Sequence, residues 1–228
     1  MNVLELKDLT KVYSKGDNEV RALDGVSMEV EPGEFMAVVG PSGSGKTTLL
    51  NIIGCLDKPS SGRVVYEGAD LGSATQQALS DYRKDRISFI FQSYNLIPVL
   101  TVAENVELPL VIEKRRDKAA MRAKALEMLA AVGLEGKANR FPRELSGGQE
   151  QRVAIARALV KDPSVVLADE PTANLDSHTA EEIVNLMKAI NASRGTTFVF
   201  STHDKLVMQH ARRVVTIRDG RLVADERR

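Results

Sequence analysis

The chain has 228 residues, and its 31 lysines and arginines are balanced by 31 aspartates and glutamates, so the formal net charge is zero. This balance argues against a surface built mainly to hold nucleic acid, because phosphate binding by counterion release needs an excess of basic residues. A hydrophobic fraction of 43% and a charged fraction of 27% are ordinary for a soluble globular protein and exclude disorder over most of the chain. We therefore expect one large globular domain that does not bind nucleic acid.

Membrane segments and disulfides are not expected either. No apolar run approaches the roughly 18 residues that a membrane span requires, and the first ten residues, MNVLELKDLT, lack the apolar stretch and cleavage site of a leader. The single cysteine, Cys55, cannot form an internal disulfide, which is typical of a reducing compartment. Because it lies in an apolar stretch, we interpret it as a buried structural thiol rather than a nucleophile. These observations predict a cytoplasmic protein.

The first part of the chain is predicted to be all β. Alternating or continuous apolar residues indicate strands at 3–6, 26–30 and 35–39, with a turn at 31–34. A further strand is expected at 63–66. This pattern predicts an N-terminal β segment over residues 1–39.

A mostly helical stretch follows from about residue 93 to 159. Thr101, with Glu104 three residues later, is a candidate capping box. Asp117 precedes a run of apolar residues at helical spacing that ends at Gly133. After this stretch, strands at 165–168 and 197–200 alternate with a helix at 177–192, and a hairpin is expected at residues 219–220. The pattern indicates an α/β core with an inserted helical region.

A phosphate-binding loop is predicted directly after the strand at 35–39. Its sequence matches G-x-x-x-x-G-K-[ST] and is followed by an apolar run typical of a helix, which is the context that the motif requires. Its glycines let backbone N–H groups surround a phosphate, and the helix that follows adds its positive N-terminal dipole. Lys46 would reach the β- and γ-phosphates, and the Thr47 hydroxyl would coordinate Mg²⁺. The candidate nucleotide-binding residues here are Gly40, Ser42, Gly43, Ser44, Gly45, Lys46, Thr47 and Thr48.

Two adjacent carboxylates end the strand predicted at 165–168. Open α/β sheets bind their ligands at the carboxyl ends of the strands, where Asp169 and Glu170 are expected to lie. Neighbouring residues point to different sides, so the two carboxylates can take different roles. Asp169 would hold Mg²⁺, directly or through water, and Glu170 would orient and deprotonate the attacking water.

A second anion site is predicted at residues 145–149, LSGGQ. Ser146 is a candidate helix cap with Gln149 as its capping-box partner, and Gly147 and Gly148 leave backbone N–H groups free at the positive end of a helix. One nucleotide needs only one phosphate cradle. The second cradle is therefore best explained if it completes the site of another copy of the chain.

Taken together, these motifs resemble those of the nucleotide-binding domains of ATP-binding cassette (ABC) transporters, and the resemblance covers essentially the whole chain. The motifs stand in the family's order, from Tyr13 through the loop at 40–48, Gln92, LSGGQ, VVLADE at 165–170 and Asp176 to His203. The resemblance implies a P-loop NTPase core with an N-terminal antiparallel β subdomain and an inserted helical subdomain. The single ABC ATPase domain would span residues 1–228, with the core at 1–92 and 160–228 and the helical subdomain at about 93–159.

The resemblance also implies roles for residues that the patterns alone do not single out. Tyr13 would stack on adenine, with a packed strand-end tyrosine as the alternative. Gln92 would contact Mg²⁺ and the attacking water, and His203 would contact the γ-phosphate and hold Glu170 in place. Asp176 would act across the dimer interface, although it could equally be a plain helix N-cap. The other histidines, His178 and His210, are interpreted as surface residues without partners.

The implied function is ATP hydrolysis, with Mg²⁺ as cofactor, by two copies that dimerise head to tail around two ATP molecules. The length is expected to accommodate no permease, so integral-membrane permease subunits would be separate and this chain would lie peripherally on the inner face of the cell membrane. Residues 94–100 are a candidate docking surface for the permease, with burial in the domain's own core as the alternative.

The sequences of residues 51–57, 91–98 and 104–110 are similar to those of the lipoprotein-releasing and macrolide-export subgroup of bacterial ABC ATPases. An amino-acid importer ATPase is the nearest alternative within the family. DNA-repair ABC ATPases usually carry long coiled-coil or zinc-bearing inserts, and this chain has neither the length nor the cysteine pairs for them. Translation-factor ABC proteins use two cassettes in one chain, whereas this chain has one.

Overall fold

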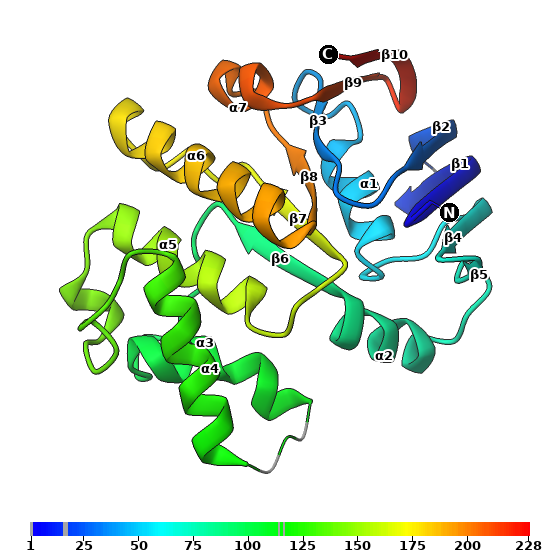
Figure 1. Ribbon diagram of the computed structural model, residues 1–228. Coiled ribbons are helices and arrows are strands. Elements are labelled where there is room, and N and C mark those ends of the chain that lie inside the picture. Colours follow the sequence, from blue (N-terminus) through cyan, green and yellow to red (C-terminus); the bar gives the residue numbers. More distant parts are fainter. Residues whose placement is uncertain (1, 16–17, 114, 116) are drawn as a thin grey trace.

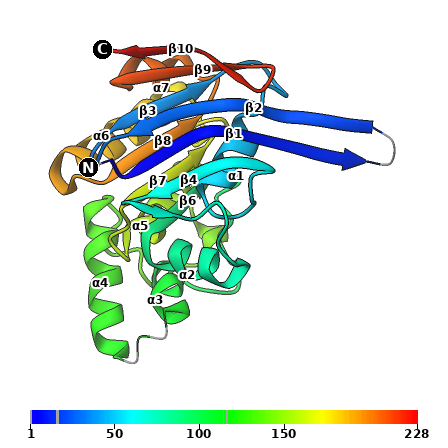
Figure 2. The same cartoon turned by 90° about the vertical axis from the view of Figure 1, so that its right-hand side faces the viewer.

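The computed structural model describes residues 2–15, 18–113, 115 and 117–228, which form two β-sheets and a set of helices (Figure 1). The first sheet is antiparallel, with strand order β2-β1-β4-β5. Its two longest strands run as a ribbon that extends past the rest of the sheet (Figure 2). The four strands are β1 (Leu4–Lys15), β2 (Asn18–Val30), β4 (Ser61–Tyr66) and β5 (Ala69–Asp70).

The second sheet is the centre of the molecule and has the strand order β10-β9-β3-β8-β7-β6. Its pairs are parallel from β9 to β6, and β10 joins the edge antiparallel to β9. The carboxyl ends of the five parallel strands therefore share one edge. The strands are β3 (Phe35–Val39), β6 (Ile87–Phe91), β7 (Val165–Asp169), β8 (Thr197–Ser201), β9 (Arg213–Arg218) and β10 (Arg221–Arg227).

The helices divide the buried apolar side chains into two cores. One core joins one face of the parallel sheet to α3, α4, α5 and α6, and the other joins its opposite face to α1, α2 and the antiparallel sheet. Figure 1 shows α3 and α4 at the end of the molecule farthest from β9 and β10. The helices are α1 (Lys46–Ile53), α2 (Gln76–Arg86), α3 (Val102–Ile112), α4 (Lys118–Ala131), α5 (Gly147–Leu159), α6 (Ser177–Arg194) and α7 (Lys205–His210), with a 3₁₀ turn at Pro142–Glu144.

The expected fold class is confirmed, with one change in how the first strands are grouped. Residues 35–39, predicted as part of the N-terminal β segment, form β3 of the parallel sheet instead. Alternate residues of β3 enter the two cores, so all five are buried and the strand reads as a continuous apolar run. Helix α2 was not anticipated, because it buries only Leu79 and has no clear apolar periodicity.

Several local expectations are confirmed. Thr101 and Glu104 form a complete capping box at α3, and Asp117 caps α4. Cys55 is buried, and that burial raises the pKa of its thiol to about 11. In the described part of the chain, no helix is both long enough and apolar enough to cross a bilayer.

The histidines outside the candidate site depart from expectation. His210 ends α7 and is half-buried rather than exposed, and its Nδ1 is buried without a hydrogen-bond partner among the described residues. His178 is exposed as expected, but it is not alone, because its Nδ1 lies 3.6 Å from Glu182 Oε1 one turn further along α6.

Candidate nucleotide-binding site

The predicted phosphate loop joins the carboxyl end of β3 to the start of α1, and neighbouring backbone packs tightly against it. A Cβ atom at Gly40 would lie 2.1 Å from the carbonyl oxygen of Ile217, and one at Gly45 would lie 2.4 Å from that of Ala22. Only glycine fits at these two positions. A cavity of about 380 Å³ beside the loop is lined by residues of β2, by Lys46 and Thr48, and by Gly220 of the terminal hairpin.

The polar groups of this loop suit a phosphate. Lys46 Nζ donates to the carbonyl oxygens of Gly40 and Pro41, at 2.8 and 3.0 Å, which places the ammonium within the curve of the loop. The hydroxyl of Ser44 is buried and has no hydrogen-bond partner in the described part of the chain. Thr47 is exposed at the first turn of α1. A cation, a free hydroxyl and a helix N-terminus thus converge on one loop.

The two predicted carboxylates lie at the same edge of the sheet. Asp169 ends β7, opposite Ser201 of β8, and Glu170 follows it. Glu170 adopts a left-handed backbone conformation, with φ of +46°, and its N–H donates to the carbonyl oxygen of Ser201 at 2.9 Å. Such a conformation is uncommon outside glycine and persists where surrounding contacts hold it.

The carboxylate of Glu170 is held by the segment that follows β8. Its Oε2 accepts a hydrogen bond from the Thr202 hydroxyl at 3.0 Å, and its Oε1 lies 2.6 Å from His203 Nδ1. The glutamate side chain is 17% exposed, while that of the histidine is 76% exposed. His203 therefore reaches into solvent from a carboxylate that is itself largely enclosed. Thr202 was not anticipated from the sequence.

Gln92 lies directly after β6 at the same edge. Its side chain is exposed, and its carbonyl oxygen accepts a hydrogen bond from Asn174 Nδ2 at 3.0 Å. Because Phe91 pairs with Asp169 in the sheet, Gln92 and Glu170 emerge next to each other. Among the described residues no cluster of three acidic, histidine or cysteine side chains could hold a metal alone. Asp169 at the end of β7 supplies one carboxylate at this edge, and proteins usually bind Mg²⁺ with one or two carboxylates together with substrate phosphates.

Residues 146–149 form the start of α5. Ser146 and Gln149 make the predicted capping box, with hydrogen bonds of 3.4 and 3.3 Å. A Cβ atom at Gly148 would lie 2.4 Å from Thr179 Cγ2. None of the residues that line the cavity at the phosphate loop comes from this turn. The turn predicted as a second anion site therefore does not contribute to the cavity beside the phosphate loop of its own chain.

Tyr13 and Asp176 are placed by contacts of their own. Tyr13 is 40% exposed on β1, and its hydroxyl donates to Asp57 Oδ2 at 2.8 Å. Although burial opposes ionisation of Asp57, hydrogen bonds from Lys11 and Tyr13 hold its pKa below the ordinary value. Asp176 is the N-cap of α6. Its carboxylate accepts hydrogen bonds from the hydroxyl and the backbone N–H of Thr179, and these hydrogen bonds lower the pKa of Asp176. Asp176 therefore caps α6, as the alternative interpretation of this residue predicts.

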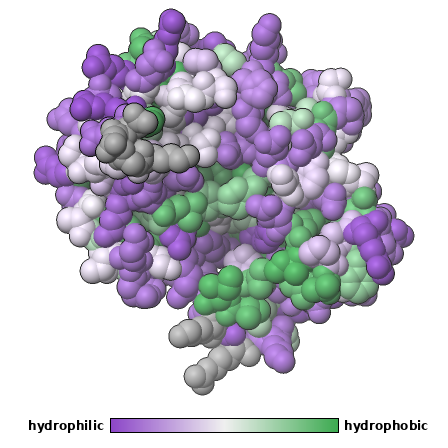
Figure 3. All heavy atoms as spheres, turned by 180° about the vertical axis from the view of Figure 1, so that it is seen from behind, coloured by the Kyte–Doolittle hydropathy of each residue, from purple (hydrophilic) through white to green (hydrophobic). Residues whose placement is uncertain are grey.

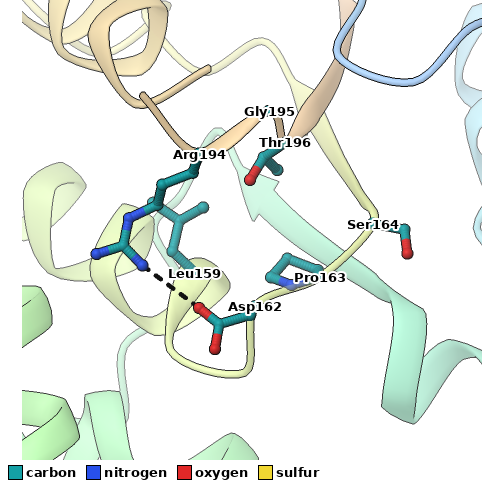
Figure 4. Close-up of a pocket in the computed structure, with 7 residues that line it drawn as sticks. All are labelled: Leu159, Asp162, Pro163, Ser164, Arg194, Gly195 and Thr196. Atoms are coloured by element: carbon teal, nitrogen blue, oxygen red, sulfur yellow. Dashed lines mark hydrogen bonds and ion pairs between the residues drawn. The ribbon is translucent and has the colours of Figure 1, made fainter. Parts of the chain in front are cut away.

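Another cavity, of about 410 Å³, lies at the opposite edge of the sheet (Figure 4). Ser164 and Thr196, which line it, precede β7 and β8, and an ion pair of 3.3 Å joins Asp162 to Arg194 across its side. Ligands of open α/β sheets bind at the carboxyl edge, so this cavity is not the candidate nucleotide site.

The comparison with known families agrees with this geometry. Residues 23–173 match the model of the ABC transporter family. The chain belongs to that family, as one of its ATPase domains. Its solved relatives include the dimeric cassette MJ0796 in a post-hydrolysis state bound to ADP and Pi, which is 45% identical with a TM-score of 0.89 over 98% of both chains.

Curated relatives of this ABC ATPase domain include two kinds of chain. The ABC transporter ATP-binding protein MJ0796 of Methanocaldococcus jannaschii is 46% identical over 99% of this chain and 97% of its own. The macrolide export ATP-binding/permease protein MacB of Hyphomonas neptunium is 47% identical over 98% of this chain. The chain spans only about a third of the length of MacB, since the match covers 34% of that protein.

Proposed function

We propose that this domain binds and hydrolyses ATP to drive the integral-membrane permease of a bacterial ABC transporter. The observation that carries the proposal is the meeting, at one edge of the parallel sheet, of a phosphate loop and the Glu170–His203 pair. A Gly-rich turn that binds no ligand would need neither the buried Ser44 hydroxyl, which has no partner among the described residues, nor a carboxylate held in a strained backbone conformation at the same edge of the sheet.

The proposed mechanism assigns one task to each side chain. Lys46 and the backbone N–H groups of the loop hold the β- and γ-phosphates, and Tyr13 stacks on the adenine. Thr47, Asp169 and Gln92 hold Mg²⁺, which neutralises charge on the phosphates when bound. Glu170 accepts a proton from the attacking water, while His203 keeps the carboxylate in place and contacts the γ-phosphate. Catalysis is then mainly positioning and charge stabilisation.

We propose further that a second copy completes each site. Ser146, Gly147, Gly148 and Gln149 do not line the cavity of their own chain, so they are free to contact the nucleotide on a partner. Asp176 would act across the same interface, beyond its helix-capping role. The dimeric form of the MJ0796 cassette supports this arrangement. ATP would close the head-to-tail dimer, and hydrolysis would reopen it.

The exchange Glu170→Gln tests the catalytic assignment. It removes the proton acceptor while keeping the size of the side chain, so we expect phosphate release to fall by about a hundredfold or more and an ATP-bound dimer to accumulate. Phosphate release and sedimentation velocity measure the two effects. Glu135→Gln, at an exposed position, is the matched control. Normal turnover of the Glu170→Gln variant would disprove the role of Glu170.

The permease is proposed to dock in a groove between the core and the helical region. The groove has a volume of about 450 Å³ and is lined by Phe89 and Phe91 of β6 and by Leu108 and Ile112 of α3. The hydrophobic surface at the bottom of Figure 3 lies over the end of α3, where Ile112 is 56% exposed. Arg83 and Lys84 also line the groove and add positive charge, so we expect the docking segment to be apolar and to carry a carboxylate.

The candidate docking residues 94–100 do not share one environment, because some line this groove and others pack against the hydrophobic core or are exposed. Asn95 lines the groove, Leu96 packs against the hydrophobic core, and Val99 is 79% exposed. Ile112→Cys should crosslink to the permease, whereas Val223→Cys, which is equally exposed on β10, should not. Cys55 gives no background because it is buried and protonated. Capture of the permease only from Val223→Cys would disprove the docking site.

We propose the lipoprotein-releasing or macrolide-export subgroup, which the name of MacB supports. The domain would then lie on the inner face of the cell membrane, with residues 93–159 as the helical subdomain that faces the permease. A permease with four spanning segments and a large external domain is expected as its partner. A multi-spanning permease of the importer type would favour the amino-acid importer alternative instead.

A further inference from the structure

A buried amide connects the helix that starts at the second anion site to the catalytic glutamate of the same chain. Gln151 lies on α5 and is fully buried. Its Nε2 donates to the carbonyl oxygen of Pro171 at 2.6 Å, and Pro171 directly follows Glu170. Its Oε1 is buried with no hydrogen-bond partner in the part of the chain that the structure describes. A buried amide with one strong bond and one free oxygen is unusual, because unpaired buried polar groups are costly.

The bond to Pro171 acts on a backbone that is already constrained. Glu170 is held in its left-handed conformation by its own N–H, which donates to Ser201, and by its carbonyl oxygen, which accepts from the N–H of Ala173 at 3.2 Å. The bond from Gln151 holds the next carbonyl group along the chain. Between this carbonyl group and Glu170 the peptide bond is planar and the proline ring fixes φ of Pro171, so few free rotations separate a shift of the carbonyl group from the Glu170 backbone.

The other end of the connection is the turn proposed to contact a partner's nucleotide. Ser146 and Gln149 stand in the first turn of α5, and Gln151 lies in the next turn of the same helix. Backbone hydrogen bonds join successive turns of a helix, so a displacement at the first turn of α5 is passed on to Gln151. The route from the partner's nucleotide to Glu170 is thus one helical turn and one hydrogen bond.

The segment after Glu170 also contacts the remaining parts of the site. Thr172 Oγ1 donates to Asp204, next to His203, at 2.6 Å, and Asn174 donates to the carbonyl oxygen of Gln92. Movement of Pro171 would accordingly shift the neighbouring residues that contact Asp204, next to His203, and Gln92. Gln151 joins α5 to this set of contacts through Pro171, and Arg157 of α5 donates to the carbonyl oxygens of Tyr94 and Asn95, shortly after Gln92.

We propose that Gln151 is a positioning residue that makes hydrolysis by Glu170 depend on engagement of Ser146–Gln149 by the partner's nucleotide. The proposal rests on the proposed ATP-driven dimer. It follows that each active site is switched on by the nucleotide of the other site, because one helix belongs to both. Hydrolysis should therefore be cooperative in ATP, and Gln151 should carry that cooperativity.

Two exchanges at Gln151 separate positioning from packing. Gln151→Met keeps the size and loses the donor, so we expect kcat to fall about tenfold, the loss of one well-formed hydrogen bond, and the Hill coefficient to fall towards one. ATP affinity measured by calorimetry without Mg²⁺ should stay within about twofold, since no contact to the phosphate loop is removed. Gln151→Glu retains a donor only while the carboxyl is protonated, and burial favours that form.

The pH profile of Gln151→Glu is the readout that a merely structural role would not move. Relative to the wild type at each pH, we expect near-normal kcat at pH 6 and a loss of about tenfold at pH 9, as the O–H that replaces the amide donor is lost. Gln151→Met should show the same deficit at both values. Phosphate release at saturating ATP measures kcat throughout.

Asn191→Leu is the control for loss of a buried amide. Asn191 is buried and donates to the carbonyl oxygens of Gly33 and Thr196, outside the nucleotide site, so its exchange should lower stability and leave the Hill coefficient unchanged. Wild-type kcat and cooperativity in Gln151→Met would overturn the proposal, as would a pH-independent ratio for Gln151→Glu. Absence of ATP hydrolysis by the wild type would instead overturn the proposed function.

Discussion

The glycines of the phosphate loop differ in what surrounds them, and this difference gives a residue-scale prediction. A Cβ atom at Gly40 would overlap the carbonyl group of Ile217, whereas one at Gly43 would meet open space. We expect Gly40→Ala to lower ATP affinity by at least about a hundredfold, since the backbone of the loop or of β9 must move by more than contact distances allow. Gly43→Ala retains only the strain of its φ of +78°, a cost of about 1 kcal/mol.

Calorimetric titration with ATP, together with thermal melting of both variants, checks this prediction. Melting shows whether Gly40→Ala stays folded, because only a folded variant reports on the loop. Equal ATP affinities for the two variants would contradict the packing argument.

Residues that act through a motif were predictable from the sequence, whereas residues that act through a partner elsewhere in the chain were not. Lys46 and Glu170 are predicted as site residues because each belongs to a local sequence motif. Thr202, Asn174 and Gln151 gain their roles only when the sheet brings Glu170, Gln92 and Pro171 beside them. No spacing of residues in the sequence indicates these long-range contacts.

Helix caps are the elements that the sequence predicts best, since both partners of a cap lie within four residues. Thr101 of α3 gives an element-scale prediction, because its hydroxyl accepts from the Glu104 N–H while its own N–H donates to Glu104 Oε2 at 2.7 Å. Thr101→Ala should lower the free energy of unfolding by about 1 kcal/mol, and Thr101→Ser should leave it within a few tenths.

Urea unfolding of the two variants measures this effect. ATP turnover of the folded Thr101→Ala variant should equal that of the wild type, because α3 supplies no residue to the nucleotide cavity. Identical stabilities of the alanine and serine variants would show that the cap contributes nothing to α3.

Sheet membership was harder to predict than strand position, for a physical reason. The strand at 35–39 was located correctly, but its neighbours in the sheet, β8 and β9, follow it by more than 150 residues. An apolar run indicates only that both faces of the strand are buried, and it does not indicate which strands and helices cover them. Helix α2 shows the converse, since a helix that buries one residue leaves almost no pattern.

At the scale of the whole molecule, the proposed dimer would give each chain one half of each of two active sites. The phosphate loop lies at the carboxyl edge of the parallel sheet, and the turn at Ser146–Gln149 does not reach its cavity. A head-to-tail dimer with two-fold symmetry would bring each loop to the other chain's turn. This arrangement makes a prediction about mixtures of two inactive proteins.

Lys46→Ala should remove the phosphate contacts of one half-site, and Ser146→Arg should block the other half-site with a bulky cation. Each variant alone forms only defective sites and should be inactive. In a mixed dimer, the intact loop of the second variant faces the intact turn of the first, so one of the two sites is whole. Because half of the dimers are mixed at random, an equimolar mixture should regain up to about a quarter of wild-type phosphate release.

The size of the recovery also distinguishes independent from coupled sites. If Gln151 links the sites as proposed, a mixed dimer has no working second site to assist the first, and the roughly tenfold loss expected for that link would lower recovery from a quarter to about a few per cent of the wild-type rate. Adding Gln151→Met to the Ser146→Arg partner should then leave the recovered rate low, because that chain carries the working Glu170. A complete absence of recovery would contradict the shared site, since a site built within one chain cannot be restored by mixing.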